Sequence, residues 1–201
     1  MIPIRDYIKG FDSLFHQCLD KAPWEIINEL DNLIQDRFSN LSAEYKIEEN
    51  IAIHKTVTVE KGVTIKGPVI ISENCFIGAN AYLRGPIFLG KSVKVGPGVE
   101  IKQSIIFENS ALAHFNYIGN SIIGKNINFE AGSICANHYN ERVDKTISVK
   151  HNGELMNTGT KKFGSLIGDD TKIGANAVLS PGTILARKSI VKRLALVEQI
   201  P

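Results

Sequence analysis

Aliphatic and aromatic residues recur every six positions along the middle of the chain. Stepping by six from Ile47 meets only such residues, and a second, mostly β-branched or small series lies four positions after each of them. A fixed short period predicts a solenoid. Six residues are too few for a helical repeat but suit a short strand and one corner, so three units make a triangular coil. The first series is Ile47, Ile53, Val59, Ile65, Ile71, Ile77, Leu83, Leu89, Val95, Ile101 and Phe107.

We expect the first series to point into the coil and its sequence neighbours to point outward, because side chains alternate along a strand. Ordinary antiparallel β-structure would instead need hairpin signals every 8 to 12 residues, which this stretch lacks. Glycines often follow a first-series residue, where we expect them to supply the permissive backbone of a tight corner. These glycines are Gly78, Gly90, Gly96, Gly119, Gly124, Gly168 and Gly174.

The six-residue phase holds to Ala113 and then slips. Units 113–117 and 118–122 have five residues each, and six-residue stepping resumes with Ile123. Departures from a repeat are places where solenoids carry function. The slip therefore draws attention to the stretch ALAHFNYIGN, which contains His114.

The two ends of the chain and one internal segment depart from the repeat. Residues 23–41 have the apolar spacing of a helix that starts at Pro23, and an earlier helix is expected over 12–20. We expect the first of these to bury one face against the open end of the coil or another subunit. Asn152-Gly153 predicts a hairpin. The predicted organisation is a helical cap over 1–46, a β-helix over 47–193 with an inserted loop at 138–165, and a tail over 194–201.

Polar residues fall into two clusters on the predicted prism. Arg84 and Lys102 are 18 positions apart, so they stack one coil apart with Glu100 beside them. Each five-residue unit lacks one position of the repeat. When these two positions are counted back in, we expect His114 and Asn128 to lie one coil apart, on a different face from Arg84 and Lys102. The two clusters cannot meet within one chain, but clusters of neighbouring chains can. A closed ring of three copies suits a three-sided prism, so we expect a homotrimer.

These patterns resemble a known family. The repeating [LIV]-G-x-x-x-x units resemble the hexapeptide repeats of left-handed parallel β-helices, which are common in acyltransferases. AYLRGP, VEIKQS, AHFNYIGN and INFEAGSICAN follow the order and spacing of the acetyltransferase half of the bifunctional enzymes that make UDP-N-acetylglucosamine. The similarity is closer to sugar-1-phosphate nucleotidylyltransferases with amino-sugar acetyltransferase tails, which share the PW-initiated helix and a segment like GTKKFGSLIGDD.

The resemblance spans residues 22–190 and implies an all-β, left-handed parallel β-helix that transfers acetyl from acetyl-CoA to the amine of an amino-sugar 1-phosphate. It also assigns roles to residues. The catalytic set is His114 as general base, Glu100 beside the partner position of the base, and Asn137 near the acetyl group. The substrate set is Arg84, Lys102, Tyr117 and Asn128, and the acetyl-CoA set is Ala131, Gly132 and Ala175.

The implied chemistry agrees with the residue types. An imidazole changes protonation near neutral pH, as a base for an attacking amine must. Guanidinium and ammonium groups bind phosphate through charge-assisted hydrogen bonds. Backbone N–H groups near Ala131–Gly132 are expected to hold the developing oxyanion.

Some residues depart from the family pattern and keep an alternative open. Glu130 stands where glycine is usual, His138 where tyrosine is common, and Ala175 where one branch has serine. Glu130 favours the alternative of a catalytically silent, trimeric scaffold that binds a sugar phosphate or a nucleotide sugar. Lys145, Lys150, Lys161 and Lys162 either reach a phosphate or belong to a solvated hairpin.

Other chemistries are disfavoured. Trimeric β-helices of the γ-carbonic anhydrase type bind zinc with a close histidine pair, which His114, His138 and His151 lack, so no metal is expected. Cys135 occupies an inward position and is not a candidate nucleophile. The 46 residues ahead of the coil are too few for the glycine-rich α/β domain of a nucleotidylyltransferase, so we expect no nucleotidyl transfer.

Composition excludes two partner classes. A net charge of +2 without a long basic run argues against nucleic acid. The apolar stretches are too short to cross a bilayer, and the first ten residues lack a signal layout, so we expect a cytoplasmic chain with reduced cysteines and no membrane contact.

Overall fold

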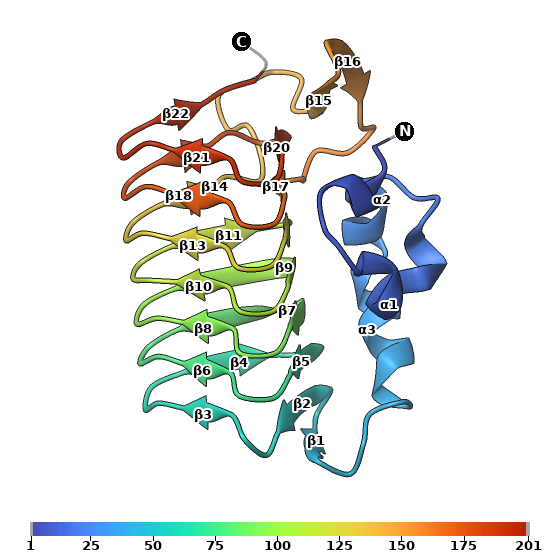
Figure 1. Cartoon of the computed structure of the whole chain (residues 1–201), viewed down its shortest axis with the longest axis vertical. Coiled ribbons are helices and arrows are strands. Elements are labelled where there is room, and N and C mark those ends of the chain that lie inside the picture. Colours follow the sequence, from blue (N-terminus) through green and yellow to red (C-terminus); the bar gives the residue numbers. More distant parts are fainter. Residues whose placement is uncertain (1, 200–201) are drawn as a thin grey trace.

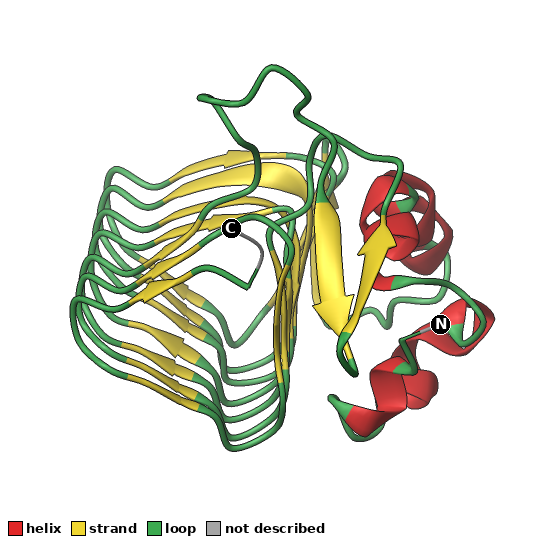
Figure 2. Ribbon diagram, turned by 90° about the horizontal axis from the view of Figure 1, so that it is seen from above, coloured by secondary structure: helices red, strands yellow, loops and turns green. Residues whose placement is uncertain are grey.

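The chain forms a left-handed parallel β-helix, as the resemblance implied, with short helices along one side (Figure 1). This computed structural model describes residues 2–199. Each coil contributes a strand to each of three faces, which Figure 2 shows as the sides of a triangle. The first face is the seven-stranded sheet of β3 (Thr58–Val59), β6 (Phe76–Ile77), β8 (Lys94–Val95), β10 (Ala111–Leu112), β13 (Asn128–Phe129), β18 (Lys172–Ile173) and β21 (Ile190–Val191).

The second and third faces belong to the thirteen-stranded sheet, in which two long strands bend from one face to the other. These long strands are β7 (Tyr82–Leu89) and β9 (Glu100–Ile106). The second face contains their first halves together with β4 (Thr64–Lys66), β11 (Tyr117–Gly119), β14 (Ile134–Cys135), β19 (Val178–Leu179) and β22 (Leu196–Val197). The third face contains their second halves together with β2 (Ile51–His54), β5 (Val69–Ile71), β12 (Ile122–Ile123), β17 (Ser165–Ile167) and β20 (Thr183–Leu185).

One of the two phase slips lies elsewhere than the sequence predicted, and the other lies where it was predicted. Leu89 pairs with Ile106, so the inward series runs from Ile101 to Ile106 in five residues, and the strand irregularity lies between Arg84 and Ile87. The second short unit runs from Ile118 to Ile123. The predicted inward positions of Phe107 and Ala113 are therefore wrong. Periodicity alone misplaced the slip because Phe107 is apolar for another reason, which is contact with the helices.

The glycines after inward residues serve a different purpose from the predicted one. Positive φ falls instead on residues such as Gly98, Phe115 and Gly132. A Cβ atom on Gly96 would overlap the carbonyl oxygen of Ala113 in the next coil. Gly96 is needed because successive coils approach each other closely here, and not because the corner requires an unusual backbone.

The helices cover the third face and not the open end of the coil (Figures 1 and 2). The helix expected over 23–41 is two helices, and the one expected over 12–20 is shorter and ends in a 3₁₀ turn. The elements are η1 (Ile4–Asp6), α1 (Phe11–Phe15), η2 (His16–Cys18), α2 (Pro23–Asn28) and α3 (Leu30–Phe38).

The helices pack on an outward row of apolar side chains, one from each coil of the third face. Phe15 lies edge-on to Phe88, with ring centroids 5.5 Å apart, and Phe11 lies 5.8 Å from Phe107. Both sides of the third face are therefore buried, which gives its strands continuous apolar runs. The outward row is Ala52, Ile70, Phe88, Ile105, Ile122, Leu166 and Ile184.

Both ends of the coil differ from the expected bounds. β1 (Tyr45–Glu48) pairs with β2 in antiparallel fashion, and Ile47 is 48% exposed, so parallel stacking begins only with β2. At the other end, β22 stacks on β19 and extends the coil into the predicted tail, whose residues 200 and 201 lie outside the described part.

The inserted loop contains the predicted hairpin. β15 (Ser148–His151) pairs with β16 (Glu154–Asn157), and Asn152 and Gly153 both have positive φ, as a type I′ turn requires. In residues 2–199, no helix is long and apolar enough for a membrane span.

Gly96→Ala is expected to lower the free energy of unfolding by about 3 kcal/mol, because the added methyl group forces adjacent coils apart. Urea unfolding followed by circular dichroism would measure the change. Gly159→Ala is the matched control, because Gly159 has positive φ but no atom within 4 Å of the new Cβ. A cost for Gly96→Ala no larger than that of the control would contradict the close-approach argument.

Candidate functional site

The second face carries the first polar cluster as predicted. Arg84 on β7 pairs in register with Lys102 on β9, so the two cations stack one coil apart. Glu100 forms an ion pair with the Arg84 guanidinium. The Arg84 Nε is buried and has no hydrogen-bond partner among the described residues. The cluster thus keeps one unsatisfied donor.

Two aromatic side chains extend this cluster along the face. Tyr82 pairs with Glu100, which in turn pairs with Tyr117, so the three form a row. Arg84 and Lys66 both lie over the Tyr82 ring, at 5.4 and 5.2 Å from its centroid. Burial, and then the charge of Glu100, raise the pKa of the Tyr117 phenol above its usual value. Tyr117 therefore acts as a hydroxyl and not as a phenolate.

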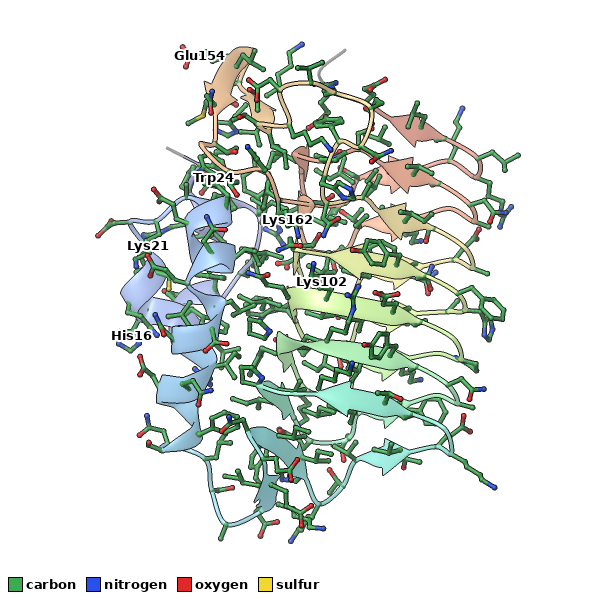
Figure 3. All side chains as sticks on the ribbon, turned by 180° about the vertical axis from the view of Figure 1, so that it is seen from behind. His16, Lys21, Trp24, Lys102, Glu154 and Lys162 are labelled. Carbon is green, nitrogen blue, oxygen red and sulfur yellow. The ribbon has the colours of Figure 1, made fainter. Side chains whose placement is uncertain are left out.

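Lys162 joins the cluster from the inserted loop (Figure 3). Burial lowers the pKa of the Lys102 ammonium, and the nearby charges of Lys162 and Arg84 lower it further. Four cations, Lys66, Arg84, Lys102 and Lys162, with one carboxylate leave an excess of positive charge on this face, which suits a phosphate dianion. The sequence grouped Lys162 with three other loop lysines, and only the path of the loop distinguishes it.

Asn137 closes the same face at the start of the loop. Its side-chain amide donates to the Asn120 side-chain oxygen at 2.6 Å, and its side chain lies beside the Tyr117 hydroxyl, over Gly119. A Cβ on Gly119 would lie 2.7 Å from the Tyr117 hydroxyl and 2.9 Å from the Asn137 side chain. Glycine therefore allows these two side chains to cross the strand.

The corner between the first and second faces, called here the first corner, holds the predicted base and donor residues. The backbone hydrogen bonds of successive coils stack His114 on Ala131 and Ala131 on Ala175. His114 is exposed and lies three residues before Tyr117, so it borders the second face. The structure thus brings the base and the donor residues into one line along a prism edge.

One of the predicted oxyanion donors at this corner already has a partner. The Gly132 N–H donates to the His114 carbonyl at 2.8 Å, so it is not available for an oxyanion. The hydrogen bond exists because it links two coils, as the backbone groups of parallel strands do.

Asn128 does not stack with His114 as predicted. It pairs with Ala111 and Lys172 on the first face. Asn128 lies 14 residues after His114, whereas one coil from His114 leads to Ala131, 17 residues on, so Asn128 falls short of the stacking position. Asn128 is exposed on its own face, away from the cationic cluster.

Glu130, the departure noted in the sequence, is fully engaged at the first corner. Its carboxylate accepts hydrogen bonds from the Arg193 Nε and NH2, both at 2.7 Å, and from the Ala175 N–H at 2.9 Å. These hydrogen bonds hold the pKa of the Glu130 carboxyl below its usual value. The negative charge is therefore paired within the chain.

The remaining candidate groups lie outside this site. Burial raises the pKa of the Cys135 thiol to about 12, so it is inert as a nucleophile. The His151 Nδ1 is 3.0 Å from the Tyr7 hydroxyl. Within residues 2–199, no three His, Cys, Asp or Glu side chains gather as metal ligands would.

Fold and site together define a hexapeptide-repeat left-handed β-helix with a cationic cluster on its second face. More narrowly, the chain belongs to the family described as the GMPPB C-terminal domain, whose model matches residues 65–200. The resemblance seen in the sequence is confirmed at the level of this domain.

Curated relatives match a limited part of the chain. It is 36% identical over 99 residues to the bifunctional protein GlmU of Methanococcus maripaludis, covering 49% of this chain and 23% of the relative. It is 34% identical over 82 residues to a bifunctional sugar-1-phosphate nucleotidylyltransferase/acetyltransferase of Sulfurisphaera tokodaii, covering 41% and 20%. The matched region is thus about a fifth of the length of these relatives.

Among solved structures, the chain is similar to the acetyltransferase domain of PglB from Neisseria gonorrhoeae in complex with acetyl coenzyme A. The identity is 15%, the coverage is 78% of this chain and 64% of the other, and the TM-score is 0.37. A likeness this weak supports no inference about the site.

Binding of a phosphate anion is expected to take up protons at alkaline pH. The pKa of Lys102 is lowered in the free protein, and a dianion beside it would raise that pKa, so Lys102 gains a proton on binding. Titration calorimetry with inorganic phosphate in two buffers of different ionisation enthalpy measures the uptake. Lys102→Met should abolish it and Lys94→Met, on the first face, should not. Binding without proton uptake would contradict the assignment.

Proposed function

We propose that this chain is an acetyl-CoA-dependent N-acetyltransferase acting on an amino-sugar 1-phosphate of the glucosamine type. The observation that carries the proposal is the cluster on the second face, where Arg84, Lys102 and Lys162 leave an excess charge suited to a phosphate dianion. The buried, unpartnered Arg84 Nε supports it, since a bound phosphate would satisfy that donor.

The reaction follows from the groups around this cluster. The sugar amine attacks the thioester carbonyl, and His114 accepts the proton that the amine loses. Collapse of the tetrahedral intermediate forms the amide and releases the thiol of coenzyme A. Glu100 holds Arg84 through their ion pair, so its role is to position the phosphate contact. Asn137 and Tyr117, whose side chains meet over Gly119, form the inner edge of the sugar site.

Acetyl-CoA is placed along the first corner in this proposal. Ala131 and Ala175 are small residues stacked above His114, so a ligand lying along this edge would bring its thioester toward the base. The relative described as a bifunctional sugar-1-phosphate nucleotidylyltransferase/acetyltransferase supports an acetyl donor, although it is matched over only part of its length.

A homotrimer completes the site in this proposal. Asn128 lies on the first face and the cationic cluster on the second, so one chain alone does not bring both to a common ligand. Large exposed apolar side chains gather along the first corner and its adjoining strands, as an interface requires. These are Phe115, Ile190, Leu194 and Leu196.

A second candidate function is a catalytically silent scaffold that binds a sugar phosphate or nucleotide sugar. The observation that favours it is the Glu130 carboxylate, which occupies the Ala175 N–H and Arg193 where the donor is placed. The two candidates share the phosphate cluster and differ in acetyl transfer alone.

The deciding experiment is a thiol-release assay with acetyl-CoA and either glucosamine 1-phosphate or galactosamine 1-phosphate. The enzyme reading requires release that depends on the amino sugar. Binding of a sugar phosphate by calorimetry, with no release of thiol, would favour the scaffold.

His114→Ala is expected to lower kcat about 10²- to 10⁴-fold, because general-base catalysis contributes this much. The substituted side chain is exposed, so the melting temperature should hardly change. Arg84→Ala should act differently and mainly raise KM for the sugar phosphate, because it removes a ground-state contact. Steady-state kinetics of both variants measure the split. A His114→Ala enzyme with near wild-type kcat would reject the base assignment.

Phe115→Asn is expected to dissociate the trimer. Phe115 has φ 53°, a backbone that costs roughly 1–2 kcal/mol, and its ring is 74% exposed although it lies against Gly98, so most of its apolar surface has no partner in an isolated chain. Asn tolerates that backbone but removes the apolar contact. Light scattering at micromolar concentration measures the mass, with Val143→Asn, an exposed loop residue, as the control. A wild-type monomer, or a Phe115→Asn trimer, would contradict the shared site.

A further inference from the structure

A surface cavity of about 500 Å³ lies at the upper end of the first face, beside the first corner. Three cationic residues line it, namely Lys172 from one coil and Lys192 and Arg193 from the next coil. Glu130 is the acidic residue of the lining. An anionic ligand would therefore find three positive groups here, one of which already has a partner.

Glu130 is bound to the groups that a phosphate would use. Its two carboxylate oxygens accept from the Nε and NH2 of Arg193 in a bidentate pair, and one of them also accepts from the Ala175 N–H. A guanidinium fork and a backbone N–H are donors that phosphate oxygens prefer. The carboxylate thus occupies an anion position with the geometry of a bound anion.

The ion pair is exposed enough to exchange partners. The Arg193 side chain is 73% exposed and that of Glu130 35%. Exposed ion pairs add little to the stability of a fold, so their rupture is inexpensive when another anion replaces the carboxylate. Lys172 and Lys192 would remain beside the incoming ligand.

We propose that Glu130 is a built-in competitor that holds Arg193 and the Ala175 N–H, and that a ligand carrying a pyrophosphate binds at this cavity by displacing it. The inference rests on the proposed function, which places acetyl-CoA along the first corner. It goes beyond that function because the affinity for the acetyl donor then depends on the Glu130 carboxylate, which occupies the acetyl-donor site in the free protein.

Calorimetry with two probes, coenzyme A and inorganic pyrophosphate, tests the proposal on the full chain. Glu130→Gln keeps the size of the side chain and removes its charge, so both probes should bind about tenfold more tightly than to wild type. The gain should vanish in an Arg193→Gln background, because no guanidinium is then released. Glu73→Gln, which removes a carboxylate paired with Lys91 on another part of the surface, is the matched control.

The outcomes separate the competitor from the donor assignment. Tighter pyrophosphate binding by Glu130→Gln, with no binding of coenzyme A to any variant, supports the competitor and rejects acetyl-CoA as the ligand. If Glu130→Gln raised the affinity for the probes equally in the Arg193→Gln background, Glu130 would act only by general charge repulsion, and the proposal would be overturned. Unchanged or weaker binding of both probes by Glu130→Gln would overturn it as well. Melting temperatures check that each variant is folded.

Discussion

Parallel stacking at one strand spacing is the constraint on which the molecule depends. Each coil must place an aliphatic side chain inward on every face and leave its backbone groups aligned with the next coil. A single residue removed from a unit therefore shifts every later position. The two short units, ending at Ile106 and Ile123, were accommodated at corners, and they set which residues of the later coils reach the second face.

The repeat, the inward series and the hairpin could be predicted because each depends on local alternation or on one turn. The position of the slip could not be, since Ile105, Ile106 and Phe107 are all apolar and periodicity cannot tell which points inward. The consecutive apolar residues that cause this ambiguity also carry information about the fold. Runs such as Val69–Ile71 indicate a strand buried on both sides, and they marked the face on which the helices pack.

The relative placement of the candidate site residues could be predicted where they share a register, and could not be predicted where it depends on the path of a loop. Arg84 and Lys102 are one full coil apart, so their stacking follows from counting. Lys162 comes from the inserted loop, which interrupts the repeat, so no spacing rule relates Lys162 to Lys102. Residue identity does not show which backbone N–H groups already have a partner, so the hydrogen bond of the Gly132 N–H could not be predicted.

The contact between the N-terminal helices and the third face has a consequence for biosynthesis. The helices precede the coil in the sequence, yet the surface that receives them is assembled from strands as distant as β17 and β20. The ring partners of Phe11 and Phe15 on this surface, Phe88 and Phe107, lie near the middle of the chain, so they are made long after the helices. Contacts between such distant segments form slowly, and transiently bare aromatic side chains invite aggregation.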